Sequence, residues 1–297
     1  MINIWCYWSQ GENNIPLLAK LCIENWKKYV SKEFKINIID KNKFLSIQND
    51  IDENLFNKLT YQQQSDYVRL YYLYYFSGIY IDITCILRNN LNWITDKFNE
   101  GFDIVGFKVN YIFSKKNDYL MENWCIGVKN KNNYIIKQWK LVFHNLLHEA
   151  YNNGGFEKSK IWKKTNKNSI FINKRKYLTQ HIAHLYCMQN NPKYFNLFKK
   201  TVYLYDAPST ALISSFNNFK TVFDNLIFGV GWKTNFQLIK ITRNDKYSLK
   251  YFCSYKFKNV INNELEYEYV KQAYIIQKIL FIIFFIIIIR IYIIKYI

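Results

Sequence analysis

Residues 1–40 alternate between segments typical of strands and a segment typical of a helix. Residues 2–8, INIWCYW, form a run of apolar and β-prone residues that predicts a buried strand. Residues 15–30 carry apolar side chains at helical spacing, and residues 34–40, FKINIID, predict a second strand. A strand, a helix and a strand at this spacing predict an α/β domain that begins with a parallel sheet.

The next segment places a helix directly before a strand. Residues 61–77 are apolar on nearly every side, which predicts a buried helix, and Gly78 stands where a helix C-terminus favours a left-handed residue. Residues 79–84, IYIDIT, predict the strand. The strand period of two puts Asp82 and Thr84 on one face, about 7 Å apart. We expect both at the carboxyl end of this strand, where open α/β sheets bind ligands.

Asp82 and Thr84 suit a divalent metal that carries a phosphorylated substrate. Such an ion takes one or two protein oxygens, and waters and phosphate oxygens fill the remaining positions. Asp66 and Arg69 are three residues apart on the preceding helix, so they share a face. A surface pair contributes only about 0.2–0.5 kcal/mol, and a buried pair is costly to desolvate. A ligand-binding role is therefore favoured over the alternative, a structural salt bridge.

The rest of the chain continues the α/β pattern. Segments typical of strands lie at residues 102–109, 123–130 and 201–206, and segments typical of helices lie at residues 133–151 and 177–189. Residues 152–169 are basic and contain two glycines, which favours a loop or an insertion. Residues 207–260 give mixed signals. Because no repeat and no Pro-rich or Ser-rich linker divides the chain, we expect residues 1–270 to form one domain.

The chain is strongly basic, with 41 lysine and arginine residues against 22 acidic residues and a formal net charge of +19. This excess could attract nucleic acid, a membrane surface or a phosphorylated substrate. Glycine (9) and proline (3) are scarce, while lysine, asparagine, isoleucine and tyrosine are abundant throughout, so compositional bias explains much of the charge. The basic residues are dispersed rather than clustered with aromatic residues, so we expect no nucleic-acid partner.

Cysteine and histidine give no specific site. The six cysteines are widely spaced without a Cys-x-x-Cys pair, which indicates neither a zinc knuckle nor a dense disulfide scaffold and favours a reducing compartment. His144 with His148, and His181 with His184, are paired at helical spacing, but a zinc site would need further ligands. The first residues lack a basic region, a long apolar core and a cleavage site, which predicts no secretory signal.

Residues 271–297 have a different character from the rest of the chain. An unbroken apolar run extends from Ile279 to Ile289, and Lys278 and Arg290 flank it. The run is too short for the ~30 Å core of a bilayer, but snorkelling of Arg290 extends it to about 18 residues or more. We expect a C-terminal hydrophobic helix that spans or lies on a membrane, with the domain of residues 1–270 in the cytoplasm. The alternative is a buried final helix.

Two segments resemble a known family of sugar transferases. Residues 65–84, SDYVRLYYLYYFSGIYIDIT, resemble the Ser-Asp-x-x-Arg and Gly-Gly-x-Tyr/Trp-x-Asp-x-Asp/Thr signature of DXD-type enzymes, namely capsular polysaccharide synthesis proteins and glycosyltransferase family 32. Residues 4–29, IWCYWSQGENNIPLLAKLCIENWKKY, are similar to the opening of the capsular family. The resemblance extends over roughly residues 2–210.

The resemblance implies a GT-A nucleotide-sugar fold, with a Rossmann-like and mostly parallel sheet flanked by helices. It also implies Mn²⁺ or Mg²⁺ as cofactor, and transfer of a sugar from a nucleotide-sugar donor to a glycan or lipid-linked acceptor with retained configuration. By position, Asp82 and Thr84 would hold the metal, while Asp66, Arg69 and Asp82 would be catalytic. The expected donor-binding residues are these four together with Trp5, Trp8, Gln10, Gly11 and Tyr80. His181 matches a family histidine and is expected on the acceptor or donor side.

Departures from the family pattern keep alternatives open. Thr84 replaces the second acid of the motif, as is common in the capsular branch, and Ser77 replaces the first of the two usual glycines. The C-terminal residues that complete the metal site in relatives find no clear match. A catalytically inactive, membrane-tethered sugar-binding protein is therefore the main alternative, and a basic nucleic-acid-binding protein is less favoured.

Overall fold

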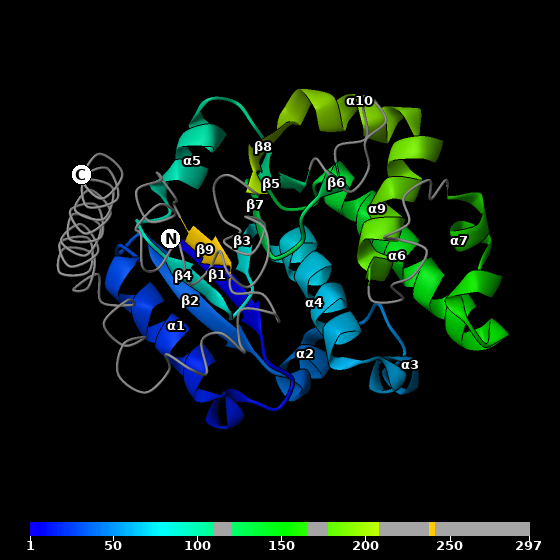
Figure 1. Ribbon diagram of the computed structural model, residues 1–297, viewed down its shortest axis with the longest axis horizontal. Helices are drawn as coiled ribbons and strands as arrows, with labels where there is room; N and C mark the ends of the chain where they lie inside the picture. Colours follow the sequence, from blue (N-terminus) through cyan, green and yellow to red (C-terminus); the bar gives the residue numbers. More distant parts are fainter. Residues whose placement is uncertain (110–119, 166–177, 208–237, 241–297) are drawn as a thin grey trace, which may run out of the picture.

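The computed structural model describes residues 1–109, 120–165, 178–207 and 238–240 (Figure 1). A seven-stranded sheet forms its centre, in the order β2-β1-β3-β7-β5-β6, with β8 also paired to β5. The strands are β1 (Ile2–Tyr7), β2 (Phe34–Ile39), β3 (Gly78–Ile81), β5 (Ile104–Val109), β6 (Leu120–Met121), β7 (Cys125–Val128) and β8 (Val202–Asp206). A separate two-stranded sheet pairs β4 (Cys85–Leu87) with β9 (Leu238–Lys240).

The sheet is mixed rather than mostly parallel, which corrects the sequence-based expectation. β1 is parallel to β2 and β3, and β8 is parallel to β5. β6 and β7, however, are antiparallel to β5, and β7 is also antiparallel to β3. β7 follows β6 after residues 122–124 and runs in the same direction. The connection from β5 to β6 has ten residues, 110–119, which is fewer than the dozen or more that a parallel crossover needs.

Helices cover both faces of the sheet. They are α1 (Leu17–Tyr29), α2 (Lys41–Ile47), α3 (Glu53–Lys58), α4 (Tyr61–Phe76), α5 (Asn92–Asn99), α6 (Tyr134–Asn153), α7 (Lys160–Lys164), α9 (Thr179–Asn190) and α10 (Pro192–Thr201), with 3-10 turns η1 (Glu12–Asn14) and η2 (Phe156–Lys158). In Figure 1, α4, α6 and α9 lie together on one side of the central strands and α1 lies on the other. The result is an α/β fold with the sheet between two helical layers.

The strand period of two divides the sheet residues between two cores. On one face, Trp5, Tyr7, Tyr80 and Ile126 pack with residues of α4, α6 and α9. On the opposite face, the neighbouring strand residues Ile4, Cys6, Ile79, Ile81 and Phe107 pack with residues of α1, α5, β4 and β9. Because both faces are covered, the strands read as continuous apolar runs in the sequence.

Helix α4 confirms the predicted buried helix. It begins with a capping box, in which the Thr60 hydroxyl accepts from the Gln63 backbone N–H and the Gln63 side chain accepts from the Thr60 N–H. Most of its residues are buried, including Asp66 and Arg69, which are each only 2% exposed. The helix ends at Phe76, and its C-cap Ser77 and the following Gly78 both have positive φ, at +54° and +97°.

Two further predicted helices are present in the structure, and the segment expected as a loop contains short helices. The predicted helices at residues 133–151 and 177–189 correspond to α6 and α9. The described part of the expected loop at residues 152–169 instead contains η2 and α7. Ser159 is the N-cap of α7, and its side chain accepts from the backbone N–H groups of Ile161 and Trp162. The expected domain boundary and the hydrophobic helix at residues 271–297 lie outside the described residues. None of the described helices is long and apolar enough to span a bilayer.

Candidate functional site

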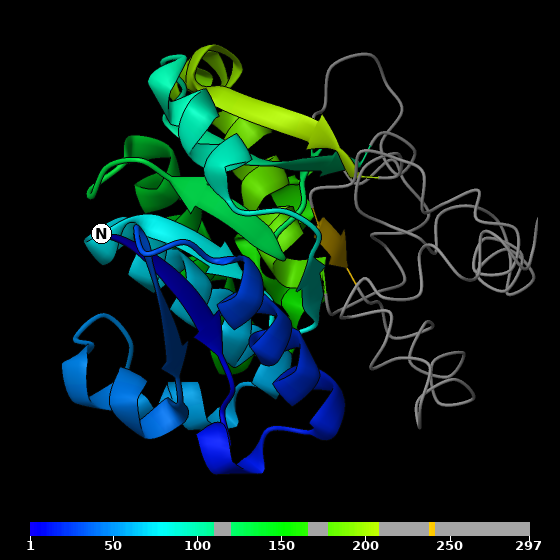
Figure 2. The same ribbon diagram turned by 90° about the vertical axis from the view of Figure 1, so that its left-hand side faces the viewer.

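The candidate site lies where β1 and β3 end. These strands are parallel neighbours, with Trp5 opposite Tyr80, and Figure 2 shows both pointing toward the side of the molecule where β9 lies. β3 ends at Ile81, so residues 79–84 are not one strand as expected from the sequence. The Asp82 N–H donates to the Trp124 carbonyl at 2.8 Å, and the Cys85 N–H donates back to the Asp82 carbonyl at 3.1 Å. Asp82 and Thr84 therefore stand in a turn between β3 and β4.

Arg69 joins the two predicted carboxylates. Its Nη1 donates to Asp66 Oδ1 at 2.6 Å, and its Nη2 donates to Asp82 Oδ1 at 2.9 Å. The guanidinium also lies over the Tyr80 ring, with Cζ 4.5 Å from the ring centroid. Tyr80 itself is 1% exposed, and its hydroxyl shares a hydrogen bond with Ser65. The structure thus brings Asp66, Arg69 and Asp82 together, with Tyr80 as the support beneath the arginine.

Two amides that sequence reasoning missed complete this cluster. Gln180 of α9 accepts from Arg69 Nη1 at 2.5 Å, and its own Nε2 donates to the Asp66 carbonyl at 3.0 Å. Asn123, in the segment between β6 and β7, donates to Asp66 Oδ1 at 3.0 Å and to Gln180 Oε1 at 2.6 Å. The signal available in the sequence was the position of Gln180 directly before His181, the histidine that the resemblance marks.

Lys240 was also missed, because it falls in the region where the sequence gave mixed signals. Its ammonium donates to Asp82 Oδ2 at 2.7 Å and to Thr84 Oγ1 at 3.0 Å. The predicted metal ligands Asp82 and Thr84 are therefore close together, as expected, but a lysine nitrogen lies between them. The Asp82 side chain is 25% exposed and the Lys240 side chain 13%, so this part of the cluster is open to a ligand.

The two carboxyls differ in their tendency to ionise. Burial raises the pKa of Asp66 to about 6, although the neighbouring Arg69 opposes the shift. Burial also acts to raise the pKa of Asp82, but Lys240 and Arg69 together outweigh it and lower that pKa below its usual value. For Lys240, burial acts to lower the pKa, and Asp82 and Cys85 outweigh it and raise the value. At neutral pH the Asp82 carboxylate and the Lys240 ammonium thus form an ion pair.

Buried atoms of the cluster keep unused hydrogen-bonding capacity. Among the described residues, no partner is found for Asp66 Oδ2, Arg69 Nε or His181 Nδ1. Buried polar atoms normally have partners, and an unpaired one costs about 1–3 kcal/mol. An acceptor and two nitrogens left without partners around one arginine are features of a site that receives a polar ligand.

The residues predicted to meet the nucleotide divide into two groups. Trp5 belongs to the core: it is 8% exposed, its ring packs against Tyr72 and Phe76, and its Nε1 donates to the Ser77 carbonyl at 2.7 Å. The period of two turns the Trp5 side chain toward α4, on one face of the sheet, rather than past the carboxyl end of β1. This placement favours a packing role for Trp5 over the donor contact that the resemblance implies.

Trp8, Gln10 and Gly11 lie in the loop after β1. Trp8 is half-buried and packs against the small cluster that contains Ile83 of the Asp82–Thr84 turn. Gln10 is exposed, and Gly11 has a φ of +83° with open space where a side chain would be. These three residues border the edge of the sheet at which Asp82 stands, so they remain available to a ligand.

His181 follows Gln180 on α9 and is 7% exposed. Its Nε2 lies 3.6 Å from Glu122 Oε2, next to the Asn123 that binds Asp66. The structure therefore places His181, which was predicted on the acceptor or donor side, beside the cluster.

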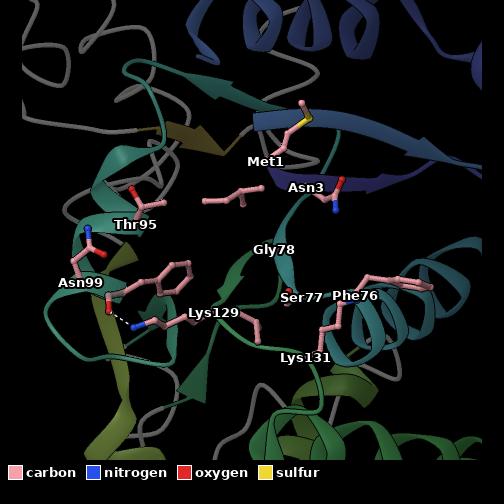
Figure 3. Close-up of a pocket in the computed structure, with 12 residues that line it drawn as sticks. Met1, Asn3, Phe76, Ser77, Gly78, Thr95, Asn99, Lys129 and Lys131 are labelled. Carbon is pink, nitrogen blue, oxygen red and sulfur yellow. Dashed lines mark hydrogen bonds between the residues drawn. The ribbon is translucent and has the colours of Figure 1, made fainter. Parts of the chain in front are cut away.

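A separate cavity of about 530 Å³ lies at the opposite ends of strands β1 and β3 (Figure 3). Met1, Asn3 and Gly78, at the amino ends of β1 and β3, line it together with Thr95 of α5 and Lys129. None of the predicted site residues lines this cavity. We assign the candidate site to the Asp66–Arg69–Asp82 cluster because, within the described residues, it joins two carboxylates and two cations and lies beside buried polar atoms that lack partners.

A family model described as "Capsular polysaccharide synthesis protein" matches residues 1–154. The O-glycosyltransferase braB of Annulohypoxylon truncatum is 26% identical over 173 residues, which cover 52% of this chain and 40% of that protein. The O-glycosyltransferase PaGT of Phomopsis amygdali is 19% identical over 171 residues, covering 52% and 41%. The chain thus spans about two fifths of the length of these relatives.

Solved structures give weaker similarities. The PaToxG glycosyltransferase matches with a TM-score of 0.39 and 20% identity over 67% of this chain and 74% of its own. Mouse xyloside xylosyltransferase 1 matches with a TM-score of 0.42 and 10% identity over 82% of this chain and 98% of its own.

Proposed function

The chain belongs to the capsular polysaccharide synthesis protein family, and from this premise we propose that it transfers a sugar from a nucleotide-sugar donor to a glycan or lipid-linked acceptor. The curated relatives named above are glycosyltransferases, which supports the proposal. A GT-A fold and retention of the anomeric configuration are part of it. The acceptor class rests on the resemblance of the sequence.

One observation carries the proposal: Asp66 and Asp82 share a single buried arginine at the carboxyl end of β3. Such a cluster is costly to desolvate, so stability alone is a weak reason to build it. In a sugar transferase each part has a use. Asp66 Oδ2 can accept from a sugar hydroxyl, and the fork of Arg69 can donate to sugar or phosphate oxygens.

The chemistry requires stabilisation of negative charge. As the bond from the anomeric carbon to the diphosphate breaks, charge develops on the phosphate oxygens, and positioned cations stabilise it. Arg69 and Lys240 are the cations beside Asp82 within the described residues. Water must also be excluded, since it would hydrolyse the donor. No enzymic nucleophile is assigned.

The resemblance predicts Mn²⁺ or Mg²⁺ at Asp82 and Thr84, and the side chains can be tested for this role. Among the described residues no group of three or more His, Cys, Asp and Glu side chains could hold a metal ion. The Lys240 ammonium already binds Asp82 Oδ2 and Thr84 Oγ1. An Mg²⁺ ion would lie about 2.0–2.1 Å from the same oxygens and would be repelled by that ammonium. This donor set does not fit a resident divalent ion, and the metal stays a prediction of the resemblance.

Membrane attachment through residues 271–297 is also part of the proposal. It is supported by the apolar run from Ile279 to Ile289 alone. An acceptor linked to a lipid would suit an enzyme held at a membrane surface, with the catalytic domain on the cytoplasmic side.

The proposal is tested by incubating the purified chain with UDP-glucose, UDP-galactose and GDP-mannose, each with Mn²⁺ and with EDTA, and by measuring the nucleoside diphosphate released. We expect release from a subset of donors by the wild type, and a loss on the order of 100-fold in the Asp82→Asn variant. The variant removes the carboxylate that holds Arg69 and Lys240, and loss of one group that stabilises the developing charge costs about that much.

Asp96→Asn is the matched control, since Asp96 is an exposed aspartate on α5, away from the cluster. It should release nucleotide at the wild-type rate. Equal rates for wild type and Asp82→Asn would remove Asp82 from the mechanism. Binding of a donor without any turnover would favour the alternative of a catalytically inactive sugar-binding protein.

A further inference from the structure

Lys240 reaches the site from a distant part of the sequence. Its strand β9 pairs antiparallel with β4, and Lys240 stands opposite Cys85, the residue that follows Thr84. This register brings the ammonium to the Asp82–Thr84 turn, where it is 2.7 Å from Asp82 Oδ2 and 3.0 Å from Thr84 Oγ1. The lysine is therefore positioned by backbone pairing as well as by its ion pair.

The pairing partner β4 is itself held firmly. Asn25 of α1 donates to the Leu87 carbonyl at 3.1 Å and accepts from the Leu87 N–H at 2.7 Å. Trp26, which is fully buried, donates to the Cys85 carbonyl at 2.7 Å. On β9, Leu238 is also fully buried. A long and flexible side chain thus starts from a fixed backbone, which reduces the entropy lost when its ammonium is held in one place.

The ammonium occupies the position at which the sequence pattern predicts a divalent cation. It binds one carboxylate oxygen and one hydroxyl oxygen, which are the two protein ligands expected for the metal. Asp82 Oδ1 is taken by Arg69, so both oxygens of the carboxylate face cations. A lysine ammonium has three N–H donors, and two of them have acceptors among the described residues. The third can donate to a ligand, and the Lys240 side chain is partly exposed there.

We propose that Lys240 is the built-in cation of this site, and that its ammonium bridges Asp82, Thr84 and a phosphate oxygen of the donor in place of a divalent metal. The inference rests on the proposed function, since it requires a nucleotide-linked donor. It assigns this chain a metal-independent mode of diphosphate binding, with Asp82 acting as the residue that orients the lysine.

Binding of UDP and of GDP to the full chain tests this assignment without depending on turnover. Isothermal titration calorimetry is carried out in EDTA and, separately, in Mn²⁺. We expect the wild type to bind at least one nucleotide in EDTA with an affinity within about threefold of that in Mn²⁺. In EDTA, Lys240→Met should weaken this binding on the order of tenfold or more, because it removes a charge-assisted hydrogen bond.

Two further variants make the result specific. Lys240→Arg keeps the positive charge and should bind in EDTA more tightly than Lys240→Met. Lys129→Met is the matched control, since the Lys129 ammonium binds the Phe98 carbonyl at the opposite edge of the sheet, and this variant should bind like the wild type. Circular dichroism of each variant reports folding, and the comparison of EDTA with Mn²⁺ on the wild type needs no variant at all.

The outcomes separate this inference from the function on which it rests. Binding that requires Mn²⁺ would overturn the role of Lys240 and leave the proposed transferase intact. Binding in EDTA that Lys240→Met leaves unchanged would also overturn that role. Absence of binding to either nucleotide under both conditions would overturn the proposed donor class and the inference together.

Discussion

At the scale of single residues, the site depends on how one arginine is shared. Arg69 binds Asp66 on its own helix and Asp82 in the turn after β3; Asp66 and Arg69 are buried, whereas the Asp82 side chain is 25% exposed. The two carboxyls consequently differ: burial dominates at Asp66, while two cations dominate at Asp82. Two acids with different ionisation in one cluster are typical of functional sites.

Replacement of Arg69 should be strongly destabilising. Arg69→Met leaves the buried Asp66 carboxylate without its cation, and loss of one partner from a buried pair costs about 3–5 kcal/mol. Urea denaturation at pH 7 measures the change in unfolding free energy. Lys97–Glu100 provides the control, because it has the same spacing of three residues but a half-exposed glutamate. Glu100→Gln should change the stability by at most about 1 kcal/mol, and equal effects of both variants would contradict the argument.

The raised pKa of Asp66 predicts a pH dependence of stability. The folded state holds this proton up to about pH 6, whereas the unfolded chain releases it near 3.9. Between these values the folded state binds more protons, so the contribution of Asp66 to the free energy of unfolding falls as the pH rises. The lowered pKa of Asp82 changes the free energy of unfolding at pH values below this window.

Asp66→Asn removes that dependence. From pH 4 to pH 7 the unfolding free energy of the variant should therefore rise relative to wild type by on the order of 1–3 kcal/mol. Urea unfolding at a series of pH values measures this difference. Asp96→Asn, an exposed substitution, should run parallel to the wild type. A difference between Asp66→Asn and wild type that stays constant with pH would show that Asp66 is ionised throughout.

At the scale of elements, the turn between α4 and β3 positions the cluster. It carries two residues with positive φ, Ser77 at +54° and Gly78 at +97°. The Ser77 carbonyl accepts from Trp5 Nε1, which ties the end of α4 to β1. A side chain at Gly78 would overlap the carbonyl oxygen of Asn3 on β1. The sequence analysis explained the glycine at position 78 by the left-handed conformation at the end of a helix. The structure adds a second reason, which is the close approach of the β1 backbone.

Substitution of two glycines separates these reasons. Gly78 and Gly101 have nearly the same φ, at +97° and +101°, but a side chain at Gly101 would meet nothing within 4 Å. Gly101→Ala should therefore show the backbone strain alone, on the order of 1–2 kcal/mol. Gly78→Ala should cost at least about 1–3 kcal/mol more, because the backbone of β1 or β3 must shift. Thermal unfolding of both variants measures the difference in stability. Equal losses of stability in the two variants would show that the contact with Asn3 contributes nothing.

At the scale of the whole molecule, the fold brings five separate parts of the chain together, one of which is the segment between β6 and β7 that contributes Asn123. α4 contributes Asp66 and Arg69, the turn after β3 contributes Asp82 and Thr84, and α9 and β9 contribute Gln180 and Lys240. The first two parts are neighbours in sequence. α9 and β9 lie more than a hundred residues away from Arg69 along the chain, and the packing of α9 on α6 and α4 and the pairing of β9 with β4 bring them close.

The resemblance to the sugar-transferase family implied the grouping of Asp82 with Asp66 and Arg69. The sequence by itself determined the first strands and helices, the buried character of α4, and the shared helix face of Asp66 and Arg69. These follow from short-range rules, because periodicity and helical spacing act within a few residues. It did not determine the antiparallel half of the sheet, the core position of Trp5, or the presence of Gln180, Asn123 and Lys240. Strand direction and the identity of distant neighbours depend on the packing of the whole chain. Lys240 reaches the position expected for the metal ion only when the chain folds.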